Sequence, residues 1–320
     1  MELRRGVGVH GVLRDSGGRV LLGRGAGGGP YPGVWQLPGG GIAHAEHPAD
    51  AVVRLFAAET GLRVAVGPVR AAIADVAVRR AEDVALHTDR LVFEVEVRGG
   101  RLRPEPGGGD VVEARGGRLR PEPGGGGDAL EWCTAEEAAA RPLLPFTAEL
   151  LGLPVVPLPA DLPRVLPAAP AGPAVDRRQR FAAYGLVTDP SGRVLLTMIA
   201  DGYPGAGRWH LPGGGTDHGE QPAAGLLREL VEEAGQVGRV VDLLAVDNLH
   251  NPAALGPEGR PLDWHGVRVI YRVRVDAPTD AVVTELAGGS TARAAWFVPE
   301  QVTGLPMTDV AARATGWNVS

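Results

Sequence analysis

Two neighbouring stretches decide how the C-terminal half of this chain folds: Gly213-Gly214-Gly215-Thr216-Asp217-His218-Gly219-Glu220 and Arg228-Glu229-Leu230-Val231-Glu232-Glu233-Ala234-Gly235. The first is a glycine-rich turn, and the second is a charged run with helical spacing. Pro222 suits the first helical position and Gly235 the residue after the end, so the sequence predicts a helix from about Pro222 to Ala234. On that helix Glu229, Glu232 and Glu233 stand at i, i+3 and i+4, so their carboxylates share one face.

Three like charges on one helical face destabilise the helix unless a positive charge lies between them. A hard divalent cation supplies that charge, because carboxylate oxygens suit Mg²⁺ or Mn²⁺. A solvated acidic face is the simpler interpretation of most charge runs. Arg228, four residues before Glu232, and the rigid glycine turn before the helix favour a metal site in this case.

These residues resemble the signature of the Nudix hydrolases, G-x5-E-x7-R-E-U-x-E-E-x-G-U, in which U is aliphatic. The chain matches eight of the nine defined positions, from Gly214 to Gly235, and departs only where Gln236 replaces the last aliphatic residue. The preceding run Trp209-His210-Leu211-Pro212-Gly213 is also similar to the usual lead-in of that family.

The same pattern occurs twice. Gly11-Val12-Leu13-Arg14-Asp15 corresponds to Gly185-Leu186-Val187-Thr188-Asp189, and the offset of 185 − 11 = 174 also relates Trp35 to Trp209, Glu46 to Glu220 and Gly61 to Gly235. A constant offset over so long a stretch indicates two copies of one domain. Each copy shows a strand, a turn, a second strand and then the glycine turn with its helix.

The resemblance implies an α/β fold with two Nudix-type α/β/α sandwich domains, each around a mixed sheet. We expect residues 1–152 and 177–320 to form these domains. Residues 153–176 contain seven prolines, and this density predicts a semi-rigid linker. Arg98-Gly99-Gly100-Arg101-Leu102-Arg103-Pro104-Glu105-Pro106 recurs 17 residues later, which indicates a duplication within a loop.

The N-terminal copy has lost most of its metal-binding pattern. Leu55 and Ala58 stand where the C-terminal copy has Glu229 and Glu232, and only Glu59 remains of the cluster. One carboxylate does not hold Mg²⁺ without further ligands. We therefore expect this copy to be non-catalytic and to act as a structural, dimer-like or ligand-binding partner.

For the C-terminal copy, the resemblance implies metal-dependent hydrolysis of the diphosphate linkage in a nucleoside diphosphate joined to another moiety. The metal would be bound by Glu229, Glu232, Glu233 and the carbonyl of Gly213. Alternatively, one of the three glutamates would be the catalytic base rather than a metal ligand. Arg228 would orient the carboxylates, and Glu220 would support Arg228. The residues that could line the substrate site are Trp209, His210, Trp264, His265 and Arg268. For these five as a class, core packing or a place on the surface at a strand end is an equal alternative.

The base could also come from a later loop, with Glu258, Asp263 and Glu285 as candidates. Pro252 stands where ADP-ribose pyrophosphatases of this family carry proline, but nucleoside triphosphates remain an equal alternative. A sensor that binds a nucleotide sugar without cutting it is a second class of function. The intact glutamate cluster argues against a sensor in the C-terminal copy.

The amino-acid composition limits the classes of partner and the cellular locations that we expect for this chain. The formal charge of −6 argues against a nucleic-acid polymer as partner. All basic side chains other than histidine are arginine. Any such side chain that contacts a phosphate therefore does so through a planar, forked guanidinium group. Cys133 is the single cysteine, and no apolar run reaches about 18 residues, so we expect a cytoplasmic protein without a membrane span. We expect the two domains to pack on each other, and a homodimer is compatible with this pattern.

Overall fold

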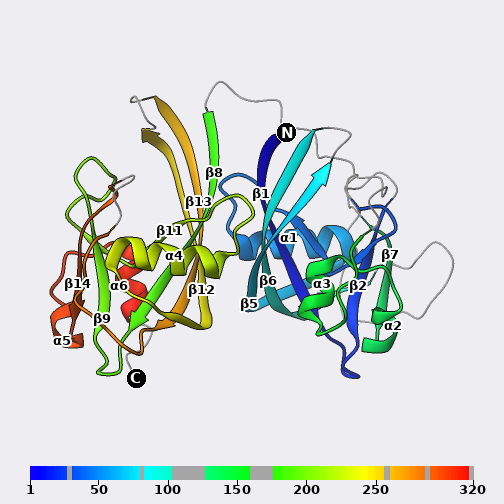
Figure 1. The fold of residues 1–320 in the computed structure, drawn as a ribbon. Coiled ribbons are helices and arrows are strands. Elements are labelled where there is room, and N and C mark those ends of the chain that lie inside the picture. Colours follow the sequence, from blue (N-terminus) through cyan, green and yellow to red (C-terminus); the bar gives the residue numbers. More distant parts are fainter. Residues whose placement is uncertain are drawn as a thin grey trace. The chain divides into compact units, whose positions relative to one another are not determined.

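The computed structural model describes residues 1–26, 31–79, 83–102, 127–158, 176–255, 260–284 and 289–316. The chain divides into two compact units, Met1–Arg177 and Arg178–Ser320. Each unit is an α/β domain with mixed sheets (Figure 1), as the sequence predicts. Among the described residues, no helix is long and apolar enough to cross a membrane.

The N-terminal unit contains a four-stranded sheet in the order β4-β1-β6-β5 and a three-stranded sheet in the order β3-β2-β7. Strands β1 and β6 are parallel, whereas β1 and β4 are antiparallel. The elements are β1 (Glu2–Leu13), β2 (Val20–Gly25), β3 (Trp35–Gln36), β4 (Gly39–Gly41), α1 (Pro48–Thr60), β5 (Leu62–Arg79), β6 (Val84–Gly100), β7 (Gly127–Cys133), α2 (Ala135–Ala139) and α3 (Pro145–Leu150).

The C-terminal unit contains one sheet in the order β10-β9-β8-β13-β12, to which β11 adds beside β8 and β14 beside β9. Its elements are β8 (Asp176–Thr188), β9 (Val194–Ile199), β10 (Trp209–His210), β11 (Gly213–Gly215), α4 (Pro222–Ala234), β12 (Arg239–Leu255), β13 (Pro261–Arg274), β14 (Thr291–Phe297), α5 (Pro299–Val302) and α6 (Asp309–Thr315).

Helix α4 begins and ends where its sequence predicts. Pro222 occupies its first turn, and Gly235 ends it in the left-handed conformation with φ 64°. The N–H of Gly235 donates to the carbonyl of Val231 and so satisfies part of the helix end. Leu226 and Leu230 are fully buried, so one apolar stripe anchors the helix while the carboxylates face another direction.

The glycine turn before each helix depends on a missing side chain. Gly213 has φ +129°, and a Cβ there would lie 2.2 Å from the carbonyl oxygen of Ala183. Gly39 has φ +150°, and a Cβ there would lie 2.1 Å from the carbonyl oxygen of Val9. Only glycine fits either position. Both copies therefore keep the backbone that brings the turn against the first strand.

Two sequence predictions fall largely outside the described residues. The 17-residue repeat lies mostly within residues 103–126, and most of the proline-rich segment lies within residues 159–175.

Candidate active site

Glu233 joins helix α4 to the glycine turn. Its side chain is 5% exposed, and one carboxylate oxygen accepts a hydrogen bond from the backbone N–H of Gly213 at 2.9 Å. The other oxygen accepts a hydrogen bond from the hydroxyl of Thr291 on β14. Both bonds fix the carboxylate and hold the turn, the helix and the strand together.

Arg228 links the other carboxylates of the motif. Its guanidinium donates to Glu229 at 3.2 Å, to Glu232 at 3.1 Å and to both oxygens of Glu220 at 3.0 and 3.1 Å. It also donates to the carbonyl oxygen of Gly215 at 3.2 Å. The hydrogen bonds to Glu220, and then the charges of the three carboxylates, raise the pKa of Arg228 above its ordinary value.

The carboxylates lie directly against the glycine turn. A Cβ on Gly214 would stand 2.8 Å from Glu229 Oε1, so the carboxylate fills the space that a side chain would need. The turn and the glutamates Glu229, Glu232 and Glu233 line one cavity of about 880 Å³.

The donor set fits a hard divalent cation. Glu220, Glu229, Glu232 and Glu233 carry four negative charges if ionised, and Arg228 is the cation hydrogen-bonded to three of them. Oxygen ligands gathered around such an excess of negative charge are what Mg²⁺ and Mn²⁺ prefer. The residues at this site therefore suit the metal that the sequence predicts.

Three of the five predicted substrate-site residues line the same cavity: His210, Trp264 and Arg268. Nδ1 of His210 lies 2.6 Å from the hydroxyl oxygen of Thr308. Burial, followed by the positive charge of Arg268, lowers the pKa of His210 to about 4, so its ring is neutral near pH 7. Arg268 forms an ion pair with Asp247 on the neighbouring strand.

The other two do not reach the cavity. Trp209 is 3% exposed and packs edge-on against Phe297, with ring centroids 4.7 Å apart. His265 is fully buried between the side chains of Gln179 at 3.0 Å and Asn248 at 2.7 Å. The structure gives both residues packing positions in the domain, which is the alternative that their sequence context left open.

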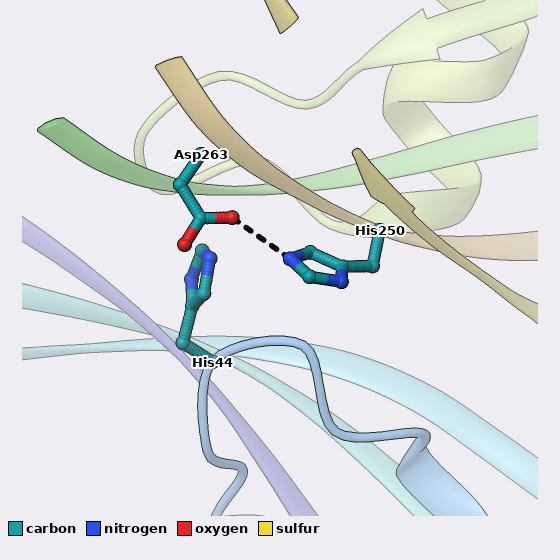
Figure 2. A group of neighbouring side chains, drawn as sticks. All are labelled: His44, His250 and Asp263. Atoms are coloured by element: carbon teal, nitrogen blue, oxygen red, sulfur yellow. Dashed lines mark hydrogen bonds and ion pairs between the residues drawn. The ribbon is translucent and has the colours of Figure 1, made fainter. Parts of the chain in front are cut away.

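Of the candidate bases outside the motif, Asp263 is the one within the described residues. Its carboxylate pairs with Nε2 of His250 at 2.8 Å (Figure 2), and it is not among the cavity-lining residues. Glu258 and Glu285 lie outside the described residues.

The structure adds two cationic cavity residues that the sequence did not single out, Arg180 on β8 and Arg208 just before β10. Both are exposed, and neither guanidinium forms a hydrogen bond or an ion pair with the residues that the structure describes. The guanidinium of Arg180 lies over Gly215, where a Cβ would stand 2.2 Å from Nη2. The absence of lysine was the available sequence signal, because it requires arginine for phosphate contacts.

Gln236, the departure from the family pattern, has a packing role. Its side chain is 1% exposed. Its amide nitrogen donates to the carbonyls of Ala234 and Asp280 and to the hydroxyl of Thr279, at 3.0, 3.2 and 2.9 Å. Its amide oxygen accepts from the N–H of Thr279 at 3.1 Å. Gln236 therefore attaches the segment after β13 to the end of α4.

The N-terminal copy keeps the scaffold of this site but not its acidic face. Glu59 accepts a hydrogen bond from the N–H of Gly39 at 3.0 Å, as Glu233 does from Gly213. Arg54 still pairs with Glu46 at 2.7 Å.

Side chains fill the space beside that scaffold. Arg90 is 6% exposed and lies over the ring of Phe146 at 4.6 Å, within 3.2 Å of Nε2 of His10. Burial, and then the charge of Arg90, lower the pKa of His10 to about 3. His10 occupies the position of Tyr184 at the offset of 174, so a cavity-lining position of the C-terminal copy is a packed one here.

One protein-family model matches most of the chain. The NUDIX domain model matches residues 3–152 and 178–316. A MutT protein from Methanosarcina mazei Go1 is 18% identical, and the match covers 44% of this chain and 93% of that chain with a TM-score of 0.35. A MutT NUDIX hydrolase from Burkholderia pseudomallei is 25% identical, with 45% and 99% covered and a TM-score of 0.34.

The NUDIX domain of Shewanella oneidensis NrtR, solved in complex with ADP ribose, is 19% identical, with 43% and 85% covered and a TM-score of 0.35. No curated protein matches the chain.

Proposed function

This chain belongs to the Nudix hydrolase family and carries two Nudix domains in tandem, and from that premise we propose that the C-terminal domain alone performs the hydrolysis. Its substrate is a nucleoside diphosphate linked to another moiety, either a nucleoside triphosphate or a nucleotide sugar such as ADP-ribose. The observation that carries the proposal is that Glu229 and Glu232 line the same cavity as the glycine turn. The N-terminal copy has Leu55 and Ala58 in place of the two glutamates.

The residues that would hold the metal are Glu229, Glu232, Glu233 and the carbonyl of Gly213. When bound, Mg²⁺ or Mn²⁺ neutralises phosphate charge and activates a water. Glu233 already accepts two hydrogen bonds, but two carboxylate oxygens offer about four lone-pair sites, so it can contribute while it holds the turn. Arg228 keeps Glu229 and Glu232 oriented and limits their repulsion.

Arg180 and Arg208 would contact the phosphate oxygens of the substrate. Both guanidiniums line the cavity without an ion-pair partner among the described residues, so they can bind an anion without first breaking another pair. At the offset of 174 the N-terminal copy has Gly6 and Val34 at these positions. The phosphate-binding cations are therefore absent from the copy that lacks the metal ligands.

For residues 1–152 we propose a non-catalytic, structural role, joined through residues 153–176 to the catalytic domain of residues 177–320. The packed group of His10, Arg90 and Phe146 supports a structural role over ligand binding at the corresponding place.

The test is a turnover screen with Mg²⁺ on nucleoside triphosphates and ADP-ribose, which compares the wild type with Glu232→Gln. We expect at least one substrate to be hydrolysed, with turnover lower by at least about a hundredfold in Glu232→Gln. Glu300→Gln removes an exposed glutamate of the same domain and is the matched control, with turnover near that of the wild type. Turnover of Glu232→Gln within a few-fold of wild type would refute the assignment.

A further inference from the structure

Three residues form an open apolar corner at one end of the cavity, which we call the β12–β13 corner: Leu249, Trp264 and Gly266. Trp264 and Gly266 are two residues apart on β13 and share a face. Leu249 stands directly opposite Gly266 in the antiparallel pairing of β12 and β13. All three line the cavity.

The corner is open because residue 266 is glycine. A Cβ at this position would lie 3.3 Å from Nε1 of Trp264 and 3.8 Å from Cβ of Leu249. The first distance is tighter than ordinary packing, so a Cβ at 266 would require the indole to shift by a few tenths of an ångström, and a larger side chain would crowd it further. The glycine thus lets the Trp264 ring lie close to the sheet.

The apolar surface of the corner is not used within the domain. Leu249 is 42% exposed, although large aliphatic side chains are usually buried. The indole of Trp264 makes no hydrogen bond and no ring contact with the part of the chain that the structure describes. An indole and a leucine that face a cavity without a protein partner are typical of a ligand platform.

The face of β13 that carries Trp264 and Gly266 continues to Arg268, and all three residues line the cavity that also contains the glutamates. Arg268 follows Trp264 by four residues on the same face, a span of about 13 Å along a strand. Burial raises the pKa of Tyr184, the nearby charge of Arg268 lowers it, and the carboxylates of Glu233 and Glu229 raise it. After burial, the charge of Arg268 also lowers the pKa of His210. A ligand with a planar ring at the corner and phosphates near the glutamates would span this distance.

The N-terminal copy lacks this corner as well as the metal ligands. On these later strands the offset between the copies is 178 rather than 174, because Arg90-Leu91-Val92-Phe93 on β6 corresponds to Arg268-Val269-Ile270-Tyr271 on β13. This places Leu86 and Thr88 where the C-terminal copy has Trp264 and Gly266. Opposite Thr88 stands Asp75, which pairs with Arg90 at 2.5 Å. The aromatic platform and the glutamates are therefore lost together.

We propose that the β12–β13 corner binds the nucleobase of the substrate by stacking on Trp264, and that it selects substrates with a planar base over sugar diphosphates or polyphosphates without one. This inference rests on the proposed function, because it concerns the same cavity. Stacking of a base on an aromatic side chain tolerates any base, since every base has a π-face.

The test measures binding rather than turnover. Calorimetric titration of the full chain with Mg²⁺ compares the four nucleoside 5′-monophosphates with ribose 5-phosphate, which has the same phosphate and sugar but no base. We expect at least one nucleotide to bind about tenfold or more tightly than ribose 5-phosphate. In Trp264→Leu, the residue of the other copy, this ratio should fall to about one, whereas Trp264→Phe should retain most of it.

Gly266→Thr, again the residue of the other copy, should lower the ratio by displacing the indole, and it tests the corner even if Trp264→Leu does not fold. No preference for any nucleotide in the wild type, or an unchanged preference in Trp264→Leu or Gly266→Thr, would overturn the inference. Base preference without turnover would refute the proposed function and not this inference. Turnover without base preference would refute this inference and leave the proposed function standing.

Discussion

Glu59 is expected to stabilise the N-terminal domain although that domain has lost its metal ligands. The Glu59 carboxylate accepts a hydrogen bond from the N–H of Gly39 at 3.0 Å, and this turn cannot move away because Gly39 lies against Val9. A hydrogen bond to a charged group contributes about 1.5–3 kcal/mol. Glu59→Ala should therefore lower the free energy of unfolding of this domain by about 1.5–3 kcal/mol.

Glu59→Gln keeps an acceptor but loses the charge, so it should lower the free energy of unfolding by only about 1 kcal/mol. The two domains need not unfold together, so the assay is hydrogen exchange of the full chain, read at β4 and α1. Turnover should stay at the wild-type level in both variants. If the hydrogen-exchange rates at β4 and α1 are the same in Glu59→Ala and in the wild type, Glu59 does not stabilise this domain and the reasoning is refuted.

Three further outcomes are expected. Glu233→Gln should reduce turnover at least about a hundredfold while the domain stays folded, as followed by circular dichroism and steady-state kinetics. Removal of 17 residues of the repeat from the segment between β6 and β7 should leave the melting temperature and turnover nearly unchanged, and a large drop in either would show that this segment packs or acts. Because the folded-state pKa of His10 is about 3, below its ordinary value of 6.5, the unfolded chain binds the proton first and stability should fall as pH drops below about 6.5. His10→Gln should weaken this pH dependence in urea unfolding at pH 7 and 5, and an equal dependence would contradict it.

Local sequence signals predicted the glutamate helix closely. Pro222 and Gly235 mark both ends of α4, because proline fits the first turn and glycine accepts the left-handed conformation. The helical spacing also placed the three glutamates on one face. It could not show that Glu233 is buried against Gly213 and Thr291 while Glu232 stays more exposed, since that difference depends on the distant strand β14.

The substrate-lining residues were harder to predict because strands alternate their faces. The residues predicted to line the substrate site include two adjacent pairs, Trp209 with His210 and Trp264 with His265. Successive side chains of a strand point to opposite sides, so one member of each pair had to face away from the cavity. His210 and Trp264 line the cavity, and their neighbours are buried in packing positions. Arg180 was missed because its position depends on how β8 meets the glycine turn.

The division of labour between the two copies is the central claim, and turnover of the separated domains tests it most directly. Residues 1–152 and residues 177–320 are assayed with Mg²⁺ separately, mixed, and beside the intact chain, on the substrate found in the screen. We expect no hydrolysis by the N-terminal fragment, and hydrolysis with weakened substrate affinity by the C-terminal fragment. Metal-dependent hydrolysis by residues 1–152 alone would contradict the account, whatever the other fragment does.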